Sequence, residues 1–167
     1  MKKLSIKKIA ALLAAFSLFG GENVLAGETA TKTIVFNDVS FLTNLVVRGD
    51  IVDGWLTNGV SAELVSPYTI TDLATGVSGT IDPLMKANTI ATRRVLWYYN
   101  SANQWAVCSD SGFQFLQQDT KDAFVTVGAA RCGARPHRLQ FYGYYIPVPG
   151  GSTWRGGYGN TAAIWFQ

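Results

Sequence analysis

Beyond its first 26 residues the chain contains no recognisable amphipathic helix, because no window carries apolar residues at i, i+3, i+4 and i+7 over three turns. Short runs of β-branched and aromatic residues alternate instead with Gly, Asn, Asp and Pro, which favour turns. We expect strands at 31–36, 41–47, 60–65, 68–73, 77–81, 89–99, 104–108, 113–116, 123–127, 138–146 and 161–166. Many short strands at this spacing predict an all-β protein, a sandwich or a barrel.

Turn signals lie between these runs. Asn58-Gly59 is the strongest, because both central residues of a type I′ hairpin turn need a positive φ. Asp53-Gly54, Ser78-Gly79 and Asp82-Pro83 are weaker breaks.

The first 26 residues have the layout of a secretory signal. Four lysines within the first eight residues precede the apolar run Ile9–Phe19, and Val24–Ala26 supplies small residues for cleavage. The run is too short to span hydrocarbon, which needs about 20 residues. We therefore predict cleavage after Ala26 and export, to the periplasm and then the cell surface, or into the medium.

Removal of this segment changes the charge balance. Cleavage takes four of the 14 Lys and Arg and one of the 11 Asp and Glu, so that basic and acidic residues become equal in number. Such a chain has no long-range field toward nucleic acid or an anionic membrane, and we predict no nucleic-acid partner. The remainder has the size of one domain, divided into a leader or donor strand at 27–36 and a β-sandwich at 37–167.

Cys108 and Cys132 are the only cysteines. In an oxidising compartment such a pair predicts a disulfide. A reactive thiol, or a metal site completed by the single histidine His137, is the alternative; with no further ligand in view, we predict neither a metal nor a cofactor.

Catalytic signals are weak. His137 has no serine elbow near it and is expected in a surface loop. Asp50 and Asp53, or Asp119 and Asp122, could face one another across a turn, but aspartates in loops are explained by turn formation. We predict that the protein is not an enzyme.

One local concentration of positive charge could form the rim of a ligand site. It could bind a sulfated or sialylated glycan or an acidic partner, and a solvated loop is the alternative. Trp154 lies among the aromatic residues of the C-terminal part, which could stack on sugar rings or simply pack. The predicted rim consists of Arg131, Arg135, His137, Arg138 and Trp154.

The chain ends in an apolar alternation, Ala162, Ile164 and Phe166, after a glycine-rich turn at 156–160. Chain ends fray unless they are tied into a sheet, so this strand is expected to be paired. Together with Leu139–Gly143 and the bend Pro147–Gly150, this pattern resembles the C-terminal part of chaperone–usher pilus subunits, nearest to the spore-coat-U-like branch.

The resemblance implies an immunoglobulin-type antiparallel sandwich that lacks its last strand. A periplasmic chaperone would fill the resulting groove, and the leader of the next subunit would replace it at an outer-membrane usher. The expected function is a structural, adhesive pilus subunit that binds copies of itself or other subunits; the alternative is a self-contained secreted glycan-binding or toxin-like module. The resemblance assigns Thr29, Thr31, Thr33 and Val35 to the donor strand, and Ala162, Ile164 and Phe166 to the strand that borders the groove.

Overall fold

The computed structural model describes residues 28–41, 43–53, 57–66, 69–71, 74–75, 78–80 and 83–167. The predicted signal segment lies outside these residues. Within the described part, the only helical element is the 3₁₀ turn η2 (Val39–Phe41), and no helix could cross a membrane.

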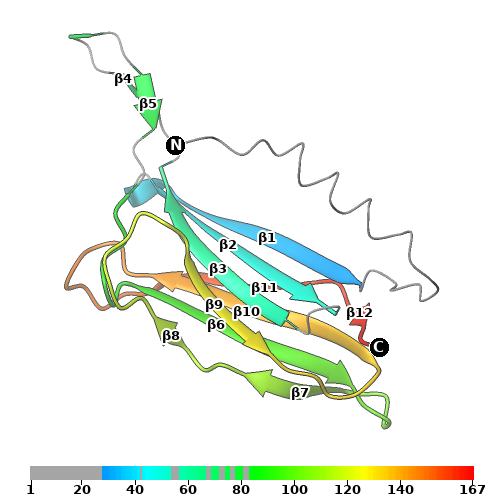
Figure 1. Ribbon diagram of the computed structural model, residues 1–167. Coiled ribbons are helices and arrows are strands. Elements are labelled where there is room, and N and C mark those ends of the chain that lie inside the picture. The colour runs from blue at the N-terminus through cyan, green and yellow to red at the C-terminus, as the bar shows by residue number, and fades with distance from the viewer. Residues whose placement is uncertain are drawn as a thin grey trace, which may run out of the picture.

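Two antiparallel sheets pack face to face (Figure 1). The first contains β1 (Thr29–Asp38), β2 (Thr43–Val52), β3 (Thr57–Val65) and β9 (Phe124–Ala129), in that order. The second has the order β11 (Arg155–Asn160), β10 (Pro136–Tyr145), β6 (Ile90–Tyr99) and β7 (Trp105–Asp110). In the second sheet β12 (Ile164–Trp165) also pairs with β10, and β8 (Gln114–Phe115) pairs with β6. A small hairpin of β4 (Thr69–Thr71) and β5 (Ser78–Thr80) projects from the sandwich (Figure 1). The predicted all-β sandwich is confirmed.

The core forms where β2 crosses β10, because alternate residues of both strands face inward. Glycine permits the close approach at two points: Gly49 lies against the Phe141 ring, and Gly143 lies against Val47. Full burial of such an apolar side chain contributes about 1.5–3 kcal/mol.

The hairpin predicted at Asn58-Gly59 is wrong. Both residues lie inside β3, and Asn58 is buried, where its Oδ1 accepts a hydrogen bond of 2.8 Å from Arg94. The chain turns earlier, at Asp53. The asparagine is therefore explained by a buried polar contact rather than by a positive φ.

The glycine-rich turn predicted at 156–160 is also wrong, because these residues form β11, paired with β10. A Cβ at Gly157 would lie 2.5 Å from the Phe36 ring, and one at Gly159 would lie 2.6 Å from the Phe141 ring. Glycine is required at these two positions because the rings of Phe36 and Phe141 occupy the space that a side chain would need.

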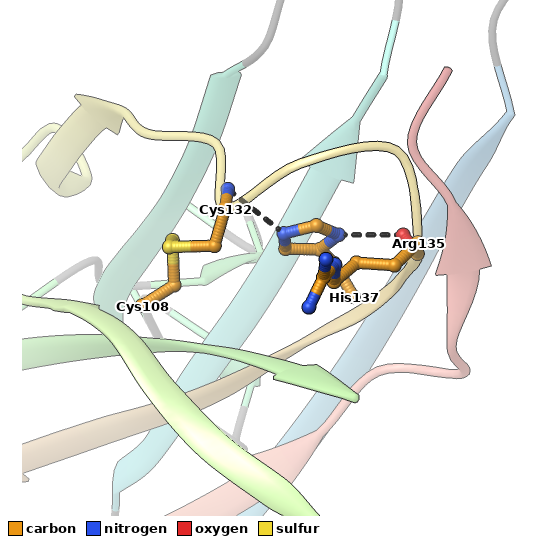
Figure 2. The surroundings of a disulfide bond; sticks show 4 residues. All are labelled: Cys108, Cys132, Arg135 and His137. Carbon is orange, nitrogen blue, oxygen red and sulfur yellow. Dashed lines mark hydrogen bonds between the residues drawn. A yellow bond between two sulfur atoms is a disulfide. The ribbon is translucent and has the colours of Figure 1, made fainter. Parts of the chain in front are cut away.

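The predicted disulfide is confirmed: Cys108 in β7 is bonded to Cys132, which follows β9 (Figure 2). It ties together the edge strands of the two sheets at one side of the sandwich.

His137 is not in a surface loop. It lies in β10, its side chain is fully buried, and its ring stacks on Phe166 with 4.2 Å between centroids. The Cys132 backbone N–H donates to Nε2, and Nδ1–H donates to the Arg135 carbonyl (Figure 2). Burial lowers the pKa of His137, and the charges of Arg135 and Arg131 act in the same direction. The imidazole is thus a neutral core group that joins the disulfide loop to the C-terminal strand.

Candidate functional site

The side of the sandwich away from the disulfide is closed by two edge strands that touch without pairing. β1 is bonded only to β2, and β11 only to β10, among the described residues, yet β1 and β11 are in contact. We call this junction the seam (Figure 1). Two adjacent unpaired edges are a template for a further strand.

Apolar side chains of β1 close the seam. Ala30 is buried, and Ile34 and Phe36 are partly buried against the core. Phe36 lies over Gly157, and the methyl groups of Ile34 reach Gly159. Packing of β1 side chains against the glycines of β11 therefore holds the two strands together at the seam.

The predicted donor residues lie on the other face of β1. Thr29, Thr31, Thr33 and Val35 are exposed, and Val35 is 57% exposed. The face of β1 that packs against the core is the one that carries Ala30, Ile34 and Phe36. By alternation Lys32 belongs to the same face of β1, but its side chain is exposed at the edge of the sheet. A charge at such a position discourages unwanted strand pairing.

Carboxylates cover the outer edge of the terminal strand. Phe166 N–H bonds inward to the Arg135 carbonyl, so the N–H groups of its neighbours point outward. Trp165 N–H donates to Glu28 at 2.6 Å, and Gln167 N–H donates to both oxygens of Asp53 at 3.3 Å. Two backbone donors that a strand would use are thus held by acidic side chains.

A buried carboxylate fixes the far end of β1. Asp38 is 8% exposed and accepts hydrogen bonds from the Tyr145 hydroxyl at 2.6 Å and from Arg155. Burial alone would raise the pKa of Asp38, but these hydrogen bonds and the Arg155 charge outweigh it, so the pKa is lowered. The carboxylate is therefore ionised at neutral pH.

The strand predicted to border a groove is shorter than expected. Thr161 N–H donates to the Leu139 carbonyl, and Leu139 N–H donates to the Thr161 hydroxyl. Residues 161–163 are not in a strand, and pairing with β10 begins again at β12. Ile164 and Phe166 are buried, whereas Ala162 is exposed, so the three residues predicted to border the groove do not share one environment. The interruption between β11 and β12 changes the alternation on which the prediction relied.

The outer face of the second sheet carries a cluster of aromatic and charged side chains. Arg93 forms a two-point ion pair with Asp110, and its guanidinium lies 5.6 Å from the ring centroids of both Phe113 and Tyr142. The hydrogen bonds from Arg93 hold the pKa of Asp110 below its ordinary value, although burial opposes them. Arg93 thus connects Asp110 of β7 with the rings of Phe113 and Tyr142 on this face.

Beside this cluster is an apolar pocket of about 250 Å³ over Ala91, lined by Phe113, Phe115, Tyr144 and Trp154. Trp154 is 39% exposed, and its ring packs 5.8 Å from that of Phe115. The pocket offers ring faces to a ligand.

The predicted ligand rim is not one site. Arg131 is exposed, Arg135 stacks on Tyr98 at 5.5 Å, and Arg138 stacks on Trp105 at 4.3 Å. In β10, His137 pairs opposite Ile164, whereas Tyr145 pairs opposite Arg155, which follows Trp154. Eight residues of strand, about 26 Å, separate these two ends.

Chemistry by a metal or a thiol finds no support in the described residues. They contain no group of three or more His, Cys, Asp or Glu that could hold a metal ion, and both cysteines are oxidised.

Several site residues were missed from the sequence: Glu28, Asp38, Asp53, Ile34, Phe36 and Arg94. The spacing of Ala30, Ile34 and Phe36 was the available signal, since these are the larger apolar residues of one strand face. Nothing local marks the acidic residues, because their partners lie more than a hundred residues away.

Comparison with known proteins gives no further guidance, because no protein-family model, curated protein or solved structure matches the chain. The function must be argued from the seam and from the faces of the sandwich.

Proposed function

We propose that the protein is an exported structural subunit of a surface pilus, and that copies join by strand addition at the seam. One observation carries the proposal: the edges of β1 and β11 lie together but do not pair with one another. The arrangement suits a strand that comes from another copy.

The resemblance of residues 139–166 to chaperone–usher subunits supports the same function. On this proposal a periplasmic chaperone and an outer-membrane usher are partners, and the exchanged segment is β1 or its equivalent from a neighbouring subunit. Ile34 and Phe36 enter the seam of the receiving copy, because glycines at 157 and 159 provide their space.

The experiment is peptide exchange. A fluorescent peptide of residues 28–38 is incubated with the mature chain after mild denaturation, and its incorporation is followed by anisotropy and size-exclusion chromatography. We expect a stable complex with the peptide, and oligomers of the chain when the peptide is absent.

Two peptide variants provide matched controls. Ile34→Asp should weaken binding by about tenfold or more, because it places a charge where an apolar side chain is buried. Thr33→Asp, on the exposed face, should have little effect. A chain that stays monomeric and never exchanges the peptide would contradict strand addition.

A second candidate function is glycan binding by a self-contained module, and the aromatic pocket with Trp154 favours it. Aromatic ring faces stack on the apolar faces of sugars. Trp154→Ala should abolish binding on a glycan array, whereas Trp165→Ala, which removes another exposed tryptophan on β12, should not. Equal binding by both variants would reject the pocket.

A further inference from the structure

A cleft lies on the disulfide side of the sandwich. Arg94 extends toward it from the inner face of the second sheet. Arg94 pairs opposite Phe141 and therefore points between the sheets. Its guanidinium lies against Gly128 of β9, where a Cβ would clash, and Nη1 donates to Asn58.

Among the described residues no carboxylate forms a salt bridge with Arg94. Asp110, whose charge acts on the pKa of Arg94, is paired with Arg93 instead. The Nε of Arg94 is buried and has no hydrogen-bond partner in the described part of the chain. Desolvation lowers the pKa of Arg94. A half-buried cation without an acidic partner is costly, and a carboxylate would relieve that cost.

The space next to Arg94 is a cleft of about 550 Å³ between the loop around β8 and strand β9. This volume is within the range of small-molecule sites. Ser111, Gln114, Gln117 and Thr126 contribute polar groups to its lining, and Phe115 contributes an aromatic ring.

The two glutamines are held in place by their amide nitrogens. Gln114 donates to the Ser111 carbonyl and Gln117 to the Phe115 carbonyl, each at 2.7 Å. No hydrogen bond within the described residues uses the side-chain oxygen of either. These oxygens can accept hydrogen bonds from hydroxyl groups.

We propose that this cleft binds an acidic sugar, with the sugar carboxylate on Arg94 and its hydroxyl groups on Gln114 and Gln117. The guanidinium supplies the positive charge that a carboxylate requires. The amide oxygens and the Phe115 ring match the hydroxyl groups and the apolar face of a pyranose. The site is distinct from the seam, so it stands whether or not strand addition occurs.

The test is a titration of the isotopically labelled mature chain followed by NMR, with three probes. Glucuronate and glucose differ in the carboxylate, and glutarate carries carboxylates without a sugar ring. We expect glucuronate to bind about tenfold more tightly than either, with shifts confined to β8, β9 and Arg94.

Variants assign the binding to the cleft. Arg94→Met should lose the preference for glucuronate over glucose, and Gln117→Ala, an exposed position, should weaken glucuronate binding without unfolding. Arg48→Met removes the same charge from the outer face of the first sheet and should change nothing.

Three results would overturn the proposal: equal affinity for glucuronate and glucose, equal affinity for glutarate and glucuronate, or the same loss in Arg48→Met as in Arg94→Met. If Arg94→Met does not fold, Gln117→Ala decides, and unchanged affinity in that variant rejects the site.

Discussion

The two sides of this sandwich are closed in opposite ways. At the disulfide side, Cys108–Cys132 links β7 to the segment after β9 covalently, and a cleft lined by Arg94 adjoins β9. At the seam, β1 and β11 are joined by packing over glycines and by carboxylates on backbone donors. One side is permanent in an oxidising compartment, whereas the other is held by contacts that can be replaced.

On the two proposals above, the two sides have separate tasks. The side with the disulfide carries the cleft next to Arg94, and the side closed by packing exchanges a strand. The predictions below test whether the two sides are as independent as this division requires.

The largest effect should come from the disulfide. Replacing both cysteines with alanine frees a loop with a sequence separation of 24 residues. The free energy of unfolding should fall by about 3 kcal/mol, measured by urea denaturation. Hydrogen exchange in β1 should keep its protection relative to the rest of the fold; an equal loss in β1 and β9 would show that the two sides are one unit.

The seam should be sensitive to added volume. Gly157→Val forces a side chain against Phe36 and should destabilise the protein by about 1–3 kcal/mol. Phe36→Ala in the same chain should recover part of this loss, so a double-mutant cycle by thermal denaturation measures the coupling. Strictly additive changes in stability would mean that the Phe36 ring does not occupy the space next to Gly157.

The anchor of β1 should depend on its carboxylate. Asp38→Ala leaves the Tyr145 hydroxyl without its partner and should cost about 1–3 kcal/mol. Asp50→Ala removes an exposed carboxylate paired with Arg48 and should cost less than about 1 kcal/mol. Similar losses in the two variants would argue against a buried anchor.

Acid should weaken both the anchor of β1 and the histidine link, at different pH. The pKa of Asp38 is lowered from 3.8, so its contribution to the free energy of unfolding is complete above that value and is lost as pH falls through the lower pKa of the folded state.

The pKa of His137 is lowered from 6.5, so its contribution to the free energy of unfolding is complete above 6.5 and is lost as pH falls through its own folded-state pKa. Thermal denaturation between about pH 5 and 7.5 isolates the histidine, since the chain has only one. Replacement of His137 by phenylalanine should remove this dependence; a dependence that persists would place its origin elsewhere.

Much of the fold followed from local pattern, since alternation along 138–146 and the two cysteines predicted β10 and the disulfide. The errors have tertiary causes. Glycines at 156–159 look like a turn because the rings that fill their space lie elsewhere in the chain, and Asn58 looks like a turn because Arg94 is 36 residues away.

The candidate site was harder to predict than the fold. His137 was expected in a surface loop after Cys132-Gly133, whereas it lies in β10 and strand alternation turns its ring inward. Trp154 is near His137 in sequence but sits at the other end of β10. Only the register of the sheet reveals this separation.

The glycines of β11 have a consequence for which strands the seam can accept. Gly157 leaves a space that the Phe36 ring fills, and two residues further on the space at Gly159 is shared by the Phe141 ring of β10 and Ile34. Such a surface distinguishes spacing and bulk rather than particular residue types. If copies join by strand addition as proposed, many sequences that place two large apolar groups in alternate positions would fit, so subunits of different sequence could join at the same seam.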